Sequence, residues 1–290
     1  MQWAQQVKTY GSLIKFSHSV FALPFALISV VFASWEWTGS ETLLSRILWI
    51  VVAMVSARSA AMGFNRLVDA PIDKENPRTA GREIPAGLIS RQAVAVLILI
   101  SSLLFIFSAW QLNPLCFYLS PVALLIIFLY SFTKRFTWLA HLILGMGIGL
   151  APVGAWLAIT GSFGLVSIVL GLAVMVWIAG FDIIYSCQDM HFDRSAGLFS
   201  IPARFGPDQA LILAKFLHVL MVLLLLVAGL LSPAGPIYYL GVVVVGLLLV
   251  IEHRLVNPGD FSKIHMAFFQ INSAIALVLM AFVLVDRFVS

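Results

Sequence analysis

Long apolar segments recur along the whole chain and restrict what it can fold into. A helix rises 1.5 Å per residue, so about 20 apolar residues cross the ~30 Å hydrocarbon core of a bilayer. Only 10% of the 290 residues are charged, whereas a soluble domain carries about 25%. The apolar segments run over residues 14–35, 43–64, 92–111, 114–132, 138–160, 164–187, 209–231, 235–251 and 264–287. We therefore predict an all-α membrane protein in which residues 1–290 form one domain with nine transmembrane helices.

The Lys and Arg residues are divided unevenly between the two sets of loops that connect these segments. Arg46 and Arg287 lie in one set, and Arg58 and Lys215 lie inside segments. The other set holds thirteen of the 17, namely Lys8, Lys15, Arg66, Lys74, Arg78, Arg82, Arg91, Lys134, Arg135, Arg194, Arg204, Arg254 and Lys263. Basic loops stay on the cytoplasmic side, so we expect this set and the N-terminus to be inside. The net charge of +4 reflects this bias, and we do not expect nucleic acid as a partner.

Two acidic stretches each follow a long apolar segment and open a long loop on the basic side. They cover residues 65–73 and 182–193 and hold five of the 13 acidic residues. Four segments separate them, an even number, so both stretches must emerge on the same side of the membrane. Long loops in compact proteins are usually functional. We expect the loops over about 65–91 and 188–208 to form a cytoplasmic cap.

Helical spacing places the polar residues of each stretch on one face of a helix. The first face carries, at intervals of four residues, Asn65, Asp69 and Asp73. The second carries, within an arc of about 80°, Asp182, Tyr185, Asp189 and Asp193. Pro71 cannot donate to the carbonyl of Leu67, so we expect the first helix to bend or end there.

Stacked carboxylates repel one another, and each costs several kcal/mol to dehydrate. A hard divalent cation relieves both costs, because Mg²⁺ takes oxygen ligands and commonly shares one or two carboxylates with a substrate phosphate. We hypothesise that the two acidic faces meet at the membrane surface and hold Mg²⁺ ions that bind a diphosphate. Basic residues near them could contact phosphate oxygens: Arg66, Lys74, Arg78, Arg82, Lys134, Arg135 and Arg194.

Several other residues have simpler interpretations. We expect His141 to have a packing or interface role, and Asn272 to form a hydrogen bond between helices. Gly145, Gly147 and Gly149 read as positions where helices pack closely. A secondary transporter would also place acids in a helical bundle, but it predicts sites at the membrane midplane and broken helices in both halves. The acids here lie at the membrane boundary, so this alternative fits less well.

The two acidic stretches resemble the paired signatures of the UbiA superfamily of intramembrane prenyltransferases. The matching patterns are Asn-x-x-x-Asp-x-x-x-Asp at 65–73 and Asp-x-x-Tyr-x-x-x-Asp-x-x-x-Asp at 182–193. The segment at 76–87 is similar to the one that follows the first motif in this family. The segment at 130–137 is similar to the 4-hydroxybenzoate branch. The resemblance covers residues from about 15 to 285, and the paired motifs are specific where either alone would not be.

The resemblance implies a helical bundle around a central cavity that opens to lipid. It also implies Mg²⁺-dependent transfer of a polyprenyl group from its diphosphate to an aromatic ring. By position, Mg²⁺–diphosphate would be bound by Asn65, Asp69, Asp73, Asp189 and Asp193. Phosphate would be contacted by Lys134 with Arg66 or Arg78, and the acceptor's carboxylate by Arg135. Asp182 and Tyr185 would line the site and orient the acceptor or receive a proton.

The acceptor implied first is 4-hydroxybenzoate, as in ubiquinone biosynthesis. The alternative is 1,4-dihydroxy-6-naphthoate, in the futalosine route to menaquinone, because residues 180–185 and 200–206 are similar to that branch. The expected partners are a polyprenyl diphosphate, the aromatic acid and membrane lipid. We expect a bacterial-type inner membrane, with the active site facing the cytoplasm.

Overall fold

The computed structural model describes residues 9–14, 21–35 and 43–289. This part of the chain is helical, with short turns and one isolated bridge between Asn257 and Asp260, which confirms the all-α prediction. The main helices are α2 (Leu23–Ala33), α3 (Leu43–Glu75), α4 (Arg91–Leu112), α5 (Pro114–Thr133), α6 (Ala140–Thr160), α7 (Leu165–Ser186), α10 (Pro207–Leu230), α11 (Pro236–Leu255) and α12 (Asn272–Val289). The short elements are η2 (Cys187–Asp189), α8 (Met190–Ser195), α9 (Ile201–Phe205) and the π-helical turn η3 (Met266–Ile271).

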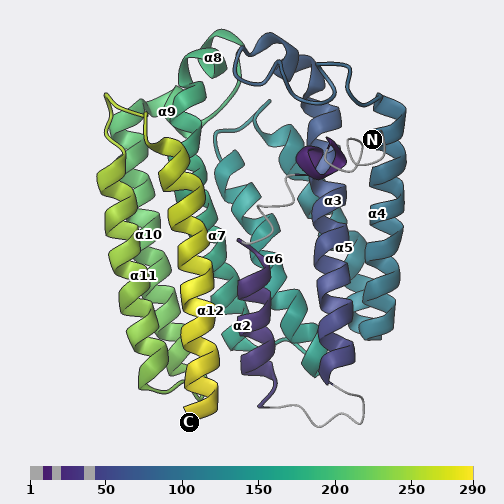
Figure 1. Ribbon diagram of the computed structural model, residues 1–290, viewed down its shortest axis with the longest axis vertical. Coiled ribbons are helices and arrows are strands. Elements are labelled where there is room, and N and C mark those ends of the chain that lie inside the picture. Colours follow the sequence, from purple (N-terminus) through teal and green to yellow (C-terminus); the bar gives the residue numbers. More distant parts are fainter. Residues whose placement is uncertain (1–8, 15–20, 36–42, 290) are drawn as a thin grey trace.

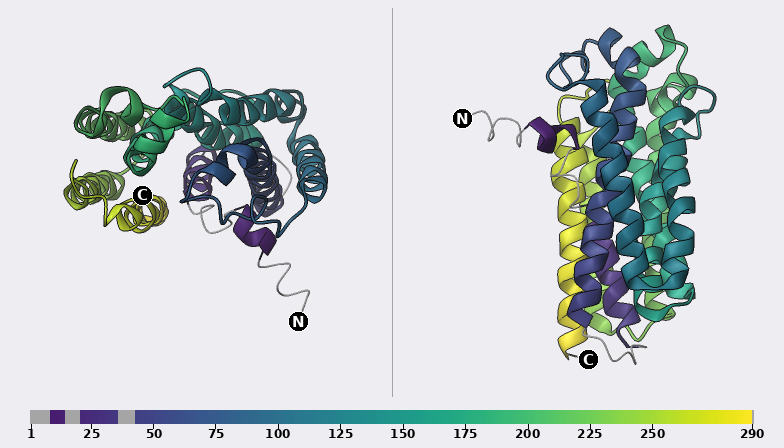
Figure 2. Two further views of the ribbon diagram at one scale, coloured as in Figure 1. Left: turned by 90° about the horizontal axis from the view of Figure 1, so that it is seen from above. Right: turned by 90° about the vertical axis from the view of Figure 1, so that its right-hand side faces the viewer.

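Eight helices in the described residues are long and apolar enough to cross a membrane: α3 to α7 and α10 to α12. They match eight of the nine predicted segments. The remaining segment, 14–35, contains α2, which has 11 residues, and its residues 15–20 lie outside the described part. The helices run side by side in one bundle (Figures 1 and 2), and α12 ends at the opposite end from residues 9–14.

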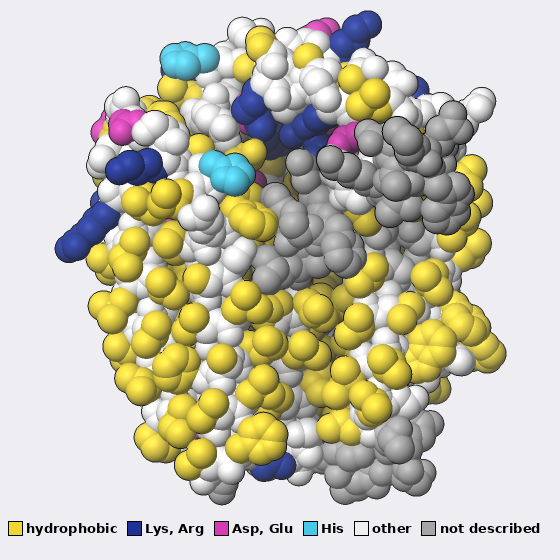
Figure 3. All heavy atoms as spheres, viewed as in Figure 1, with side chains coloured by type: hydrophobic (Ala, Val, Ile, Leu, Met, Phe, Trp, Pro, Cys, Tyr) yellow, Lys and Arg dark blue, Asp and Glu magenta, His cyan; other side chains and the backbone are white. Residues whose placement is uncertain are grey.

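The outer surface of the bundle has the polarity that a membrane requires. Apolar side chains cover its sides, while Lys, Arg, Asp and Glu gather near the upper end in the view of Figure 3. Exposed large apolar residues come from most of the long helices and include Leu99, Leu125, Leu223 and Leu247. This distribution is that of an integral membrane protein. Lys8 and Lys15, which contributed to the charge asymmetry, lie outside the described residues.

Helix α3 projects beyond the membrane and carries the first acidic stretch. Its 33 residues span roughly 50 Å, well over the ~30 Å of hydrocarbon. The helix does not end at Pro71 but continues to Glu75. Near Pro71, the carbonyl of Val68 accepts a hydrogen bond from Nη2 of Arg135 at 2.9 Å. Asp69 and Asp73 therefore stand on its last two turns.

The spacing predicted one regular helix for the second acidic stretch, but the structure breaks this helix. Helix α7 ends at Ser186, and the 3₁₀ turn η2 leads into α8. The hydroxyl of Ser186 donates to the carbonyl of Ile183 at 2.9 Å, and the thiol of Cys187 lies 3.5 Å from the same oxygen. Side chains that bond to this carbonyl compete with the helical N–H of Cys187, which turns to Ile184 instead. The break re-aims Asp189 and Asp193.

Glycines allow α6 and α7 to approach closely. A Cβ atom on Gly145 would meet the carbonyl oxygen of Met175, and one on Gly149 would lie 2.5 Å from that of Gly171. Small residues at such crossings let helix backbones touch. The expected packing role of these two glycines is confirmed. Gly147 instead faces Ile127, at 3.4 Å, beside an internal cavity.

Replacing Gly145 by alanine should therefore destabilise the bundle. The new methyl group meets backbone rather than a flexible side chain, and overpacking of this kind costs about 1–3 kcal/mol. The measurement is thermal unfolding in detergent. Gly246→Ala is the matched control, because nothing lies within 4 Å of a Cβ there. Equal melting temperatures for the two variants would contradict this account of the α6–α7 contact.

Candidate active site

The two acidic stretches line a single polar pocket of about 150 Å³ at the upper end of the bundle. All predicted site residues except Arg66 lie on its wall: Asn65, Asp69, Asp73, Arg78, Lys134, Arg135, Asp182, Tyr185, Asp189 and Asp193. They come from α3, from the loop after it, from the end of α5, and from α7 to α8. The predicted meeting of the two acidic faces is thus present in the fold, although 109 residues or more separate their members.

Arg78 connects the loop after α3 to the second acidic stretch. Its Nε and Nη2 donate to the two oxygens of Asp189 at 2.7 and 2.5 Å, a bidentate pair. Nη1 donates to the hydroxyl of Tyr185 at 3.2 Å. The side-chain NH₂ of Asn76 donates to the carboxylate of Asp189 at 3.2 Å, and the side-chain oxygen of Asn76 accepts from the backbone N–H of Arg78 at 2.9 Å. Asn76 was not foreseen, because only this turn brings it to Asp189.

The first acidic stretch is also neutralised by cations from other elements. Arg82, which we expected only as one of several possible phosphate contacts, donates to Asp73 at 2.6 Å. Asn65 donates to Asp69 at 2.8 Å, as the four-residue spacing predicts, and Arg135 lies 3.5 Å from the same carboxylate. Each carboxylate of α3 in the pocket thus has a guanidinium nearby.

Lys134 stands among the carboxylates without pairing closely to any of them. Within the described residues its ammonium makes no ion pair shorter than 4 Å. Burial alone would lower the pKa of Lys134, but the nearby charges of Asp193, Asp182, Asp189 and Asp69 together raise it above its usual value. The lysine therefore keeps its positive charge and is available to an incoming anion.

Asp182 is held by a buried histidine. Nδ1 of His141 lies 2.7 Å from Oδ2 of Asp182, and Nε2 of His141 accepts from the backbone N–H of Ile201 at 3.3 Å. Because Nε2 accepts, the neutral ring carries its proton on Nδ1 and donates it to the carboxylate. His141 is fully buried. Our expectation of a packing or interface role missed this contact; the signal for it was an acid inside segment six that needed a partner.

Arg66 and Arg194 do not line the pocket. Arg66 is 5% exposed and does not line it. It lies seven residues before Asp73 on α3, which places the two on nearly the same face of that helix. Arg194 donates to the carbonyl of Ala203 at 2.7 Å and so ties α8 to α9. Helical spacing alone therefore cannot decide which of the arginines near an acidic stretch will line the pocket.

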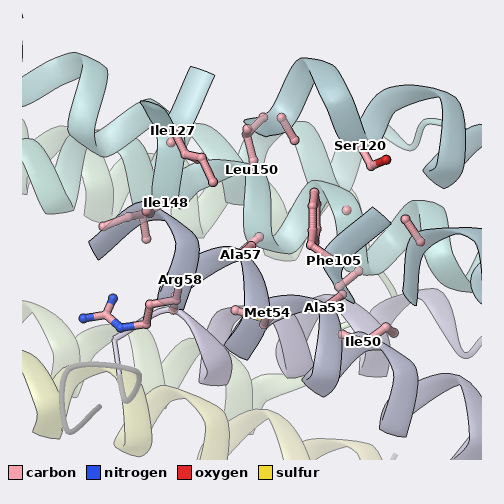
Figure 4. A pocket seen from close by; sticks show the side chains of 18 of the residues that line it. Ile50, Ala53, Met54, Ala57, Arg58, Phe105, Ser120, Ile127, Ile148 and Leu150 are labelled. Atoms are coloured by element: carbon pink, nitrogen blue, oxygen red, sulfur yellow. The ribbon is translucent and has the colours of Figure 1, made fainter. Parts of the chain in front are cut away.

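A second cavity, of about 260 Å³, is lined mainly by apolar side chains, some of which are labelled in Figure 4. It is lined by α2 to α6, and Tyr130 lies on the wall of both cavities. Small residues make much of its wall, among them Ala53, Ala57 and Ala151. Among the described residues that line it, Arg58 is the one with a formal charge. An arginine at this depth marks a functional site by default.

The donor set of the polar pocket suits a hard cation. Oδ2 of Asp73 and Oδ2 of Asp193 are buried and have no hydrogen-bond partner within the described residues. In the same part of the chain, no three acidic, His or Cys side chains converge on one point. Mg²⁺ does not require such a cage, since it usually takes one or two carboxylates together with waters and substrate phosphate. The residues present therefore fit Mg²⁺ bound jointly with a diphosphate.

Comparisons with known proteins agree with this arrangement. A family model described as the UbiA prenyltransferase family matches residues 22–274. The 4-hydroxybenzoate octaprenyltransferase of Aeromonas salmonicida is 31% identical over 254 residues, which cover 88% of each chain.

Solved structures show the same fold. The apo structure of a UbiA homolog from Aeropyrum pernix superposes with a TM-score of 0.83 at 31% identity, covering 93% of this chain and 98% of that one. A UbiA homolog from Archaeoglobus fulgidus, bound to DMAPP and Mg²⁺, superposes with a TM-score of 0.76 at 19% identity over 97% of this chain and all of the other. The chain described here belongs to the UbiA prenyltransferase family and is a prenyl-transferring enzyme.

Proposed function

We propose that the protein transfers a polyprenyl group from its diphosphate to an aromatic acid, with 4-hydroxybenzoate as the acceptor. The observation that carries this proposal is the junction of two unlike cavities. A pocket of acids and bases meets an apolar cavity at Tyr130, which matches a substrate with a charged head and a hydrocarbon tail. The name of the Aeromonas relative supports the choice of acceptor.

The diphosphate would bind in the polar pocket. Asp69, Asp73, Asp189 and Asp193 would hold Mg²⁺, which when bound supplies positive charge that stabilises the leaving diphosphate. Arg78 now pairs with Asp189. If that carboxylate held Mg²⁺ instead, the guanidinium would be free to bind phosphate oxygens, which suit its forked geometry. Lys134 and Asn65 would add further contacts to the diphosphate.

The prenyl chain would lie in the apolar cavity. Along α5 the wall runs from Tyr130 to Cys116, about 20 Å at 1.5 Å per residue. An allylic cation that forms at the upper end of this cavity meets few water molecules, because the wall is almost wholly apolar. Exclusion of water prevents hydrolysis of the cation before the acceptor attacks.

The transfer breaks the carbon–oxygen bond to the diphosphate and forms a carbon–carbon bond to the acceptor ring beside its hydroxyl. The ring then loses one proton. We assign its acceptance to Asp182, because this residue lines the pocket and His141 holds one oxygen of its carboxylate in place. Tyr185 belongs to the diphosphate side, through its bond to Arg78. The acceptor's carboxylate would pair with Arg135, at the rim of the pocket, or with Arg58, in the apolar cavity.

We place the active site on the cytoplasmic side. The polar pocket is lined by Arg78, Arg82, Lys134 and Arg135, whereas Arg46 lies in the first turn of α3, at its opposite end. Basic residues concentrate on the cytoplasmic side of inner-membrane proteins. A bacterial-type inner membrane is consistent with the relative from Aeromonas.

Asp69→Asn and Asp189→Asn should each lower diphosphate release by about 100-fold or more, the size of effect seen when one preorganised charge-stabilising group is removed. The assay uses purified protein, Mg²⁺, a polyprenyl diphosphate and 4-hydroxybenzoate. Asp260→Asn is the control, since this exposed acid lies outside the pocket. Full activity in either pocket variant would refute the metal-binding role.

One set of experiments can identify both the aromatic acceptor and the arginine that binds its carboxylate. We expect mass spectrometry of products from a panel of aromatic acids to show prenylated 4-hydroxybenzoate. Prenylation of 1,4-dihydroxy-6-naphthoate alone would favour the menaquinone alternative. Arg135→Gln should raise the KM for the aromatic acid about 10-fold, as loss of a charged hydrogen bond does, with no such change for a phenol that lacks a carboxylate. If Arg58→Gln, and not Arg135→Gln, raised the KM for the aromatic acid in this way, Arg58 would be the residue that binds the acceptor's carboxylate.

His141→Leu should lower kcat by about 10-fold or more, because Asp182 loses a hydrogen bond to its charged group. His141→Gln should retain most of the activity. Its amide can donate to Asp182 and accept from the N–H of Ile201, as the imidazole does. The KM for the diphosphate should stay constant in both variants. An equal loss in the glutamine and leucine variants would show that the histidine does not act through this hydrogen bond.

A further inference from the structure

A cluster of buried polar side chains lies outside both cavities, among α7, α11 and α12. Its centre is Asn272, which is fully buried, as are Trp177 and Glu252 beside it. The indole N–H of Trp177 donates to Oδ1 of Asn272 at 2.7 Å. Nδ2 of Asn272 donates to Oε1 of Glu252 at 3.0 Å. The predicted hydrogen bonding of Asn272 between helices is confirmed, and it joins three of them.

The orientation of the Asn272 amide follows from its neighbours. An indole N–H can only donate, so the amide oxygen faces Trp177 and the NH₂ group faces the other way. There it also donates to the carbonyls of Ala267 and Phe268, at 3.0 and 3.2 Å. These carbonyls belong to the π-helical turn η3, Met266–Ile271. π-Helical turns are rare in proteins, and those that occur frequently lie at functional sites. Asn272 thus fastens η3 to α7 and α11.

The turn η3 places an aromatic ring against Tyr185, a residue that lines the polar pocket. The rings of Phe268 and Tyr185 have centroids 4.2 Å apart and are inclined by 36°. Phe181 meets the ring of Phe268 edge-on, at 5.1 Å. Tyr185 in turn lines the pocket and accepts from Arg78, which holds both oxygens of Asp189. A continuous set of contacts therefore runs from Asn272 to the second acidic stretch.

We propose that Phe268, fixed by Asn272, is a positioning residue for Tyr185 and sets the place of its hydroxyl relative to Arg78. The contact of the two rings restricts how the Tyr185 ring can turn. Without it, the hydroxyl can leave Arg78, and the guanidinium loses one of its three acceptor atoms, the other two being the oxygens of Asp189. This inference rests on the proposed function, because it assigns Phe268 to the same reaction. Phe268 does not itself line the pocket.

The test compares Phe268→Leu with Phe269→Leu. Both residues lie in η3. The ring of Phe269, however, is next to the rings of His265 and Phe21, with centroids 6.2 and 5.9 Å apart, and not next to that of Tyr185. Kinetics of diphosphate release and thermal unfolding would be measured for both. We expect Phe268→Leu to lower kcat about 2- to 10-fold, the value of one aromatic contact. Phe269→Leu should leave kcat unchanged, and Phe268→Tyr, which keeps the ring, should restore it.

A double-mutant cycle separates positioning from packing. Tyr185→Phe keeps the ring and removes the hydroxyl that Arg78 contacts. If Phe268 acts by placing this hydroxyl, Phe268→Leu should cause no further loss of kcat in the Tyr185→Phe background. Independent, additive losses, or equal losses in the Phe268 and Phe269 variants, would overturn the proposal while leaving the proposed function intact. A wild-type protein that releases no diphosphate with any aromatic acceptor would overturn both.

Discussion

Carboxylates at the edge of a membrane bundle are costly unless cations balance them, and this balance organises the polar end of the molecule. Arg78 holds Asp189 and Arg82 holds Asp73. Both arginines belong to the loop after α3, so the ion pairs also fasten that loop over the ends of the helices. The same carboxylates are the candidate metal ligands. The cap is therefore built from interactions that a bound Mg²⁺–diphosphate would exchange for its own.

The polar pocket and the apolar cavity beside it together suit a substrate that has a charged head and a hydrocarbon tail. Tyr130 belongs to both walls, and small residues on α3 and α6 leave the apolar space open. Glycines give α6 and α7 their close contact, which keeps Asp182 on α7 next to His141 on α6. The membrane-spanning packing and the chemistry of the site are thus set by the same pair of helices.

Support for the site comes from residues that do not line the pocket. His141 is fully buried and fixes Asp182, while the backbone N–H of Ile201 fixes the ring of His141. On the other side, Asn272 fastens the turn that brings Phe268 against Tyr185. Preorganisation of this kind reduces the movement that the reacting groups must make, which is a large part of electrostatic catalysis.

The sequence by itself determined the helices and the composition of the site. Apolar length predicted nine spans, and eight of them are confirmed in the described residues. The four-residue spacing placed Asn65 against Asp69. Both predictions depend only on local helical geometry. Tertiary structure alone decided which cation meets which acid. Arg78 reaches Asp189 across 111 residues, Arg66 does not line the pocket, and Asp182 pairs with His141. Such pairings depend on helix rotation and on the break at Cys187–Asp189, and both of these arise from packing between segments that no local pattern encodes.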